Sequence, residues 1–213
     1  MENFLKETKY LNYSNPQFDA FLQGVHLHGT NKEKAIQLYY FVRDSFLYDP
    51  FHLDLRPEAL IGSSILQKKR SWCVEKSIVL AACARRIEIP SKLGYSIVVN
   101  HIGTERLEFY LKKREIVFHG YVELFIEGKW VKCTPAFDQR VCRINKVEPL
   151  NWDGETDSMF QAFSGDQQFM EYVHQYGDFA DVPIALMNAE MKAHYPHLFE
   201  QEFNSKEFSF FHM

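Results

Sequence analysis

The sequence is poor in cysteine and has no long apolar run. It holds four cysteines in 213 residues, and without a secretion signal these do not indicate a disulfide framework. The segment from Met1 to Thr8 alternates charged and apolar residues, unlike a signal peptide. No run of about 18 apolar residues occurs, so we expect no membrane span. These absences favour a reducing cytoplasm, in which a thiol is free to react.

An excess of positive charge is also missing. Lys and Arg number 24 against 28 Asp and Glu, for a net charge of −4, so we expect no nucleic-acid partner. The basic stretch 112–114 is short and typical of a solvated turn. No CxxC or HExxH spacing occurs, so we expect no metal and no cofactor; a zinc site built from Cys and His is a weak alternative.

What the chain does have is enough apolar surface for one folded domain. Hydrophobic residues make up 46% and aromatic residues 15% of the sequence, which argues against general disorder. We expect a core at residues 1–146, including an N-terminal helical part. Residues 147–213 are less regular, with one possible helix at 167–175, and we expect them to wrap the core as part of the same domain.

Two helices are predicted in the first half. Thr30 and Glu33 have the spacing of a capping box, and the residues from Ala35 to Phe46 repeat apolar positions with helical period. A second helix is expected from about residue 72 to 86, capped by Ser71. Its middle is small or apolar on every side, which indicates a buried helix.

After residue 91 the pattern changes to strands. We expect strands at 93–99, 106–111, 116–126 and 129–134, with Glu127 and Gly128 as a two-residue hairpin turn and Pro135 ending the ladder. A buried helix followed by an antiparallel sheet predicts an α+β fold.

Cys73 is the first candidate for chemistry. It falls in the first turn of the buried helix, where free N–H groups and the positive end of the helix dipole favour a thiolate. We therefore expect its pKa to be depressed. Cys83 lies in the middle of the same helix among alanines and is expected to be structural.

His119 is the second candidate, and the hairpin register places it. The expected cross-strand pairs on the apolar face are Ile126 with Lys129, Leu124 with Val131, and Val122 with Cys133. A slip of one residue would break this apolar face. His119 and Glu123 then share the opposite face, where Glu123 pairs with Lys132 and Thr134 is a diagonal neighbour of His119.

Both segments resemble a known family. Residues 72–95 are similar to the cysteine-helix segment of bacterial transglutaminase-like domains, and residues 119–135 are similar to their histidine hairpin. The likeness covers roughly residues 30–138. It implies a papain-like fold, a covalent thioester at Cys73, and transfer of the acyl group to water or an amine, with a peptide or small amide or ester as substrate.

The chain departs from the family at one position. Such domains usually place an aspartate before the proline that ends the second hairpin strand, and this sequence has Thr134 there. A hydroxyl can orient the imidazole but cannot stabilise an imidazolium as a carboxylate does. Asp138 is an alternative orienting acid. For the oxyanion we expect the Cys73 backbone N–H, with Gln67 as a possible second donor.

These features predict a cysteine peptidase or amidase, with Cys73 as nucleophile and His119 as base. Hydrolysis is favoured over cross-linking because nothing marks a site for an amine donor. The alternative is a catalytically weak or inactive fold that binds peptides or proteins, and Thr134 is its best support. The substrate and the oligomeric state cannot be read from the sequence.

Overall fold

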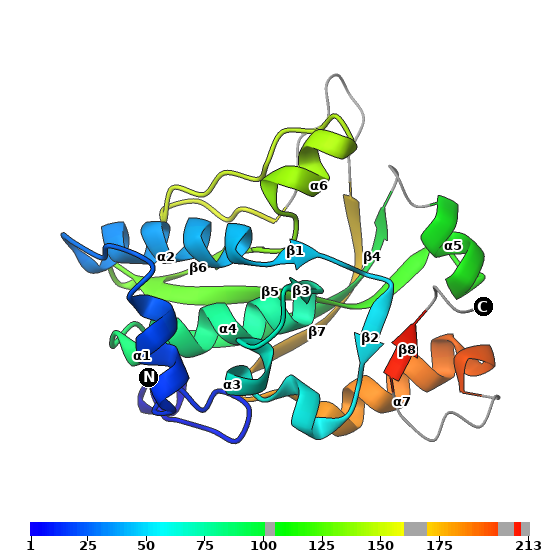
Figure 1. The fold of residues 1–213 in the computed structure, drawn as a ribbon, viewed down its shortest axis with the longest axis horizontal. Coiled ribbons are helices and arrows are strands. Elements are labelled where there is room, and N and C mark those ends of the chain that lie inside the picture. Colours follow the sequence, from blue (N-terminus) through cyan, green and yellow to red (C-terminus); the bar gives the residue numbers. More distant parts are fainter. Residues whose placement is uncertain (101–104, 160–169, 200–206, 210–213) are drawn as a thin grey trace.

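The computed structural model describes residues 1–100, 105–159, 170–199 and 207–209 (Figure 1). The α-helices are α1 (Pro16–Leu22), α2 (Asn31–Ser45), α3 (Gly62–Ile65), α4 (Cys73–Arg86), α5 (Glu105–Leu111), α6 (Gln139–Ile144) and α7 (Ile184–His194). The strands are β1 (Leu47–Tyr48), β2 (His52–Asp54), β3 (Arg70–Ser71), β4 (Ser91–Asn100), β5 (Glu115–Ile126), β6 (Lys129–Cys133), β7 (Met170–Phe179) and β8 (Glu207–Ser209). Short 3-10 turns lie at Glu2–Phe4, Pro57–Leu60 and Pro196–Leu198.

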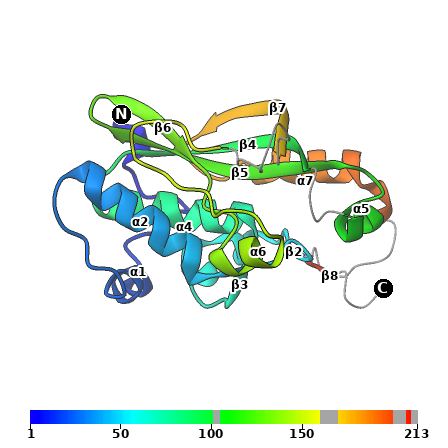
Figure 2. The ribbon, with the colours of Figure 1, turned by 90° about the horizontal axis from the view of Figure 1, so that it is seen from above.

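A four-stranded antiparallel sheet with the order β6-β5-β4-β7 forms the centre of the fold. Helices α2 and α4 lie on the same side of this sheet (Figure 2). Two smaller pairs, parallel β1–β3 and antiparallel β2–β8, stand apart from it. The predicted α+β class, with a cysteine-bearing helix packed on an antiparallel sheet, is confirmed.

The two predicted helices are present, with one difference at a terminus. Thr30 Oγ1 accepts from the Glu33 N–H at 3.3 Å and the Glu33 carboxylate accepts from the Thr30 N–H at 2.7 Å, so the capping box is complete. Every residue of α4 from Cys73 to Arg85 is buried. The prediction that Ser71 caps α4 is wrong, because Ser71 belongs to β3 and pairs with β1.

The predicted hairpin register is confirmed residue by residue. Val122 pairs with Cys133, and Glu123 pairs with Lys132. The Lys132 Nζ lies 3.5 Å from a carboxylate oxygen of Glu123, so the expected cross-strand charge pair forms. Glu127 and Gly128 both have positive φ, 50° and 85°. A two-residue hairpin turn requires this, because the twist of the turn must match the twist of the two strands.

For two predicted elements the expected type of secondary structure is wrong. The candidate strand at 106–111 is helix α5, because Leu107 and Leu111 are spaced to bury one helical face. The candidate helix at 167–175 is strand β7 from residue 170 onward, paired along β4; residues 167–169 lie outside the described part. Pairing with a neighbouring strand overrides a weak local pattern, and the sequence does not show that pairing.

The C-terminal part of the described chain is hydrogen-bonded to the central sheet at the start of β5. Tyr195, directly after α7, donates its hydroxyl to the Glu115 carbonyl at 2.7 Å and accepts from the Val117 N–H at 2.8 Å. The division at residue 146 within one domain stays a prediction. Within the described ranges, none of the helices has the length and apolar character needed to cross a membrane.

Helix α4 and strand β5 approach each other closely at Gly120. A Cβ built on Gly120 would lie 3.0 Å from the Val74 Cα, 3.1 Å from the Ser77 Oγ and 3.2 Å from the Cys73 carbonyl oxygen. Two of these neighbours are backbone atoms of a buried helix and cannot move aside. A glycine is therefore required here for the start of α4 to reach the sheet.

We expect Gly120→Ala to lower the free energy of unfolding by about 1–3 kcal/mol, the usual loss when an extra methyl is forced into a packed core. The matched control is Gly128→Asn, at a position with φ of 85° and nothing within 4 Å of the added Cβ. Asparagine tolerates that backbone conformation, so the control should be nearly neutral. Urea unfolding measures both; equal losses would contradict the close approach.

Candidate active site

Cys73 is the first residue of α4 and lies at the contact between this helix and β5. The backbone N–H groups of Gly120, Val74 and Cys73 itself lower the pKa of its thiol. Two of these donors belong to the free first turn of the helix, and the third belongs to the facing strand. The predicted position at a helix start is thus confirmed, and a strand amide adds to it.

The prediction of a depressed pKa is wrong for this conformation. Burial raises the pKa of the Cys73 thiol to about 11, although the three backbone N–H donors lower it. The nearby Glu75 carboxylate adds a smaller upward shift. The side chain is only 2% exposed, and loss of hydration of the thiolate outweighs the helix start. At neutral pH the group is therefore a thiol.

His119 follows an irregularity in the pairing of β4 with β5. Ser96 pairs with His119 and Val98 with Ile116, so two residues of β5 oppose one residue of β4. One of these two, Phe118, has a φ of 62°, which is strained for a bulky side chain. Such bulges redirect the side chains beside them. Here the bulge immediately precedes His119 and its neighbour Gly120.

The imidazole of His119 is neutral and buried. It is 1% exposed, and burial lowers its pKa to about 4. Its Nε2 has no hydrogen-bond partner among the described residues. The Cys73 sulfur and this nitrogen are therefore not bonded to each other. Gly120, whose backbone N–H lowers the pKa of the Cys73 thiol, is the next residue after His119 in the chain.

Thr134, in the place of the usual acid, is buried and directly follows β6. Its hydroxyl lies 3.7 Å from the Met159 sulfur and hydrogen-bonds with the Tyr172 side chain. The Tyr172 ring meets the His119 ring edge to face, with centroids 6.1 Å apart. Thr134 and His119 are thus connected through Tyr172 on β7. Tyr172 was not singled out from the sequence, because its approach depends on the β4–β7 pairing.

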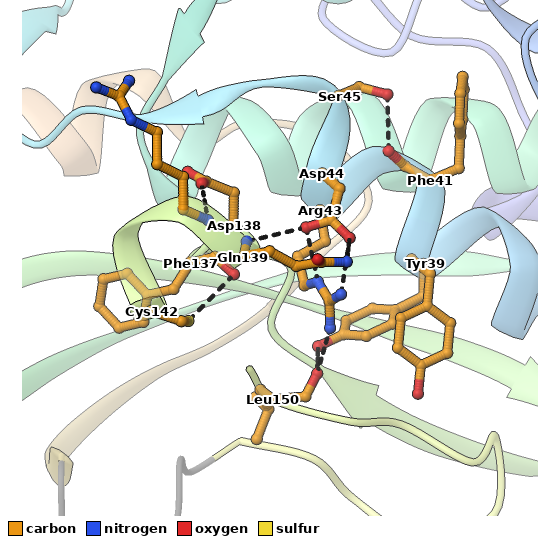
Figure 3. A network of polar contacts seen from close by, with 12 residues as sticks. Tyr39, Phe41, Arg43, Asp44, Ser45, Phe137, Asp138, Gln139, Cys142 and Leu150 are labelled. Atoms are coloured by element: carbon orange, nitrogen blue, oxygen red, sulfur yellow. Dashed lines mark hydrogen bonds and ion pairs between the residues drawn. The ribbon is translucent and has the colours of Figure 1, made fainter. Parts of the chain in front are cut away.

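Asp138 and Gln67 lie in different surroundings. The Asp138 carboxylate accepts from the N–H groups of Arg140 and Val141 at the start of α6, at 2.8 and 3.1 Å, and from the Tyr48 N–H at 2.6 Å. Figure 3 shows Asp138 at this helix start. Gln67 is exposed. Whether Asp138 orients His119, and whether Gln67 donates to an oxyanion, stay predictions.

A buried polar network fixes the chain that follows Thr134. The Lys76 Nζ, three residues after Cys73, donates to the carbonyls of Arg43 at 2.9 Å and Ala136 at 2.8 Å. Burial lowers the pKa of Lys76 to about 8. Asp44 holds Arg43 on one side and Gln139 on the other (Figure 3). These bonds tie α2, α4 and the segment from Thr134 to α6 into one unit.

Several buried polar side chains of the described residues have no hydrogen-bond partner, and those of Trp72, Ser77 and His119 are among them. Native proteins leave few polar atoms unsatisfied, so each such group needs an explanation. Among them, Trp72 directly precedes Cys73 and was not predicted as a site residue. The sequence gives no sign that its indole N–H lacks a partner.

No candidate metal centre is found in the ranges that the structure describes: no three His, Cys, Asp or Glu side chains are grouped to hold an ion. None of the four cysteines forms a disulfide, and all four are buried.

Comparisons with protein families and with solved structures each gave a match. The family model of the transglutaminase-like superfamily matches residues 20–135, more than half of the chain. A solved structure of a candidate cysteine protease from Cytophaga hutchinsonii is 14% identical with a TM-score of 0.46, and the match covers 62% of this chain and 40% of that chain. Among curated proteins none matches. The chain belongs to the transglutaminase-like superfamily, whose papain-related fold it has.

The buried neutral state of His119 predicts a pH dependence of stability. Its pKa is about 4 when folded and 6.5 ordinarily, so the unfolded chain binds the extra proton first as pH falls. The free energy of unfolding should therefore decrease between about pH 6.5 and 4, by up to about 1.4 kcal/mol per pH unit from this residue. Urea unfolding of wild type and His119→Gln measures it. Parallel curves for the two proteins would refute the assignment, because the other titrating groups are common to both.

Proposed function

We propose that this protein is a thiol acyl-transfer enzyme, a cysteine peptidase or amidase acting on a peptide or a small amide or ester. The observation that carries the proposal is the surrounding of the Cys73 sulfur. It is held at the first residue of a buried helix and contacted by N–H groups of both α4 and β5. Rigid presentation of a sulfur among N–H donors suits a nucleophile that forms a thioester.

The pKa values favour general-base catalysis over a preformed ion pair. With the thiol near 11 and the imidazole near 4, both groups are neutral at pH 7. His119 would take the thiol proton as the sulfur–carbon bond forms, and then give it to the departing amine or alcohol. Water attacks the thioester next, which releases the acid and restores the thiol. The Nε2 without a partner is available for that proton.

The second candidate is a non-catalytic module that keeps the fold and binds a peptide or protein. Thr134 favours it, because the hydroxyl is engaged with Met159 and Tyr172 and brings no negative charge to His119. Without a carboxylate the imidazolium that forms during the reaction is less stabilised.

Hydrolysis of p-nitrophenyl esters at different pH values tests the reaction. Because both reacting groups are neutral, kcat/KM should be nearly flat between about pH 6 and 9. Cys73→Ala should abolish the hydrolysis, and His119→Gln should lower the plateau by about 100-fold or more. A rate that climbs tenfold per pH unit across this range, equally in His119→Gln, would contradict the role of His119.

Thr134→Asp separates the enzyme from the binding module. In the enzyme, a carboxylate near His119 raises the pKa of the imidazole and stabilises its cation, so we expect faster ester hydrolysis. Thr134→Asn is the matched control, because it has nearly the same shape without the charge. Equal rates in the two variants, with no gain over wild type, would favour the binding module.

A further inference from the structure

Tyr172 on β7 connects Thr134 with His119. Its ring meets the His119 ring edge to face, with centroids 6.1 Å apart and planes at 79°. At the far end of the tyrosine, the hydroxyl donates to the Met159 carbonyl at 3.3 Å. Burial raises the pKa of this phenol, a hydrogen bond with the Thr134 side chain lowers it, and charge on the Cys73 sulfur raises it further. The ring is therefore anchored at its hydroxyl and lies near both reacting groups.

The sheet is distorted where Tyr172 reaches His119. Strand β4 lies between β5 and β7, and side chains two strands apart start about 10 Å from each other. The register of β4 shifts against β5 between Ser96 and Val98, and against β7 between Ile97 and Val98. Irregularities of this kind redirect side chains. Both fall at one place on β4, so the two rings can meet across this strand.

The imidazole of His119 depends on such packing for its orientation. Its Nε2 has no hydrogen-bond partner among the described residues, and Thr134 brings no negative charge to hold the ring. Rotation about the last bond of a histidine side chain is only weakly restricted by the residue itself. An edge-to-face contact favours one arrangement of the two rings. A general base needs such a fixed orientation, because the proton moves only over a short distance.

We propose that Tyr172 is a positioning residue for His119: its ring, anchored by Met159 and Thr134, holds the imidazole in the orientation for which related domains use an acid. The inference rests on the proposed thiol chemistry of Cys73. It adds to that chemistry a residue from β7, a strand that begins at residue 170, after the family match at 20–135.

The first test is a double-mutant cycle that measures kcat/KM for p-nitrophenyl propionate above a Cys73→Ala background. Tyr172→Leu removes the ring and keeps an apolar side chain. At pH 7 we expect a loss of about 100-fold, the usual effect of misplacing a reacting group by about 1 Å. In the His119→Gln background the same change should have no further effect, because Tyr172 acts through His119. Equal losses in both backgrounds would overturn the proposal.

The pH profile separates positioning from a merely structural role. The pKa of the Cys73 thiol is about 11, and below it the thiolate fraction rises about tenfold per pH unit. A thiolate attacks without a base, so a misplaced His119 matters less as pH rises. The ratio of wild type to Tyr172→Leu in kcat/KM should therefore fall at least tenfold between pH 7 and pH 10. A constant ratio would overturn the positioning role.

Tyr172→Phe keeps the ring and removes its anchor. We expect kcat/KM between those of wild type and Tyr172→Leu, because the ring contact remains but is less fixed. The matched control is Tyr176→Phe on the same strand, where the lost hydroxyl donates to Glu190 on α7 at 2.7 Å; it should keep the wild-type rate. Urea unfolding checks that each variant is folded. If Tyr172→Leu does not fold, Tyr172→Phe takes its place in the cycle and the pH profile.

The two levels of the proposal fail differently. If wild type hydrolyses none of the ester above the Cys73→Ala background, the thiol chemistry is refuted, and the role of Tyr172 with it. If wild type hydrolyses the ester and both Tyr172 variants keep its rate, only the role of Tyr172 is refuted.

Discussion

The first turn of α4 packs against β5 with no side chain between the two backbones, and the geometry of the site follows from that contact. Gly120 makes it possible, since any Cβ there would meet the backbone of Val74 and Cys73. At this distance an N–H of the strand reaches the Cys73 sulfur. The same contact fixes the position of His119, which is the residue before Gly120 in β5.

This close packing has opposite effects on reactivity. It brings three N–H donors to the sulfur, and it also removes the water that a thiolate needs. Burial prevails for both groups, which leaves a neutral thiol and a neutral imidazole. A site of this kind is poised for proton transfer during the reaction rather than before it. A small, mostly apolar cavity of about 30 Å³ also borders Cys73.

The sequence predicted those parts of the fold that depend on neighbouring residues. The α2 capping box, the buried α4 and the hairpin register could all be read from spacing, and Glu123 with Lys132 fixed the register. Helix α5 and strand β7 could not, because each is decided by packing against segments far away.

For the site, spacing placed Cys73 at a helix start and His119 on the hairpin. Spacing in the sequence could not give the pKa values, because the burial that shifts them depends on residues from the whole chain. It also could not find Tyr172 or Trp72. Tyr172 reaches His119 only through a strand from the C-terminal part. Trp72 is distinguished only by a hydrogen bond that its indole does not make.

The central claim is that the sulfur held between α4 and β5 is the nucleophile. Its most direct test is to mix the protein with p-nitrophenyl propionate, quench with acid within the first turnover, and map the added mass by peptide mass spectrometry. The account predicts one propionyl group, on the peptide that carries Cys73, and none at Cys83, Cys133 or Cys142. A propionyl group spread over other residues, or no adduct at Cys73 while ester is consumed, would contradict it.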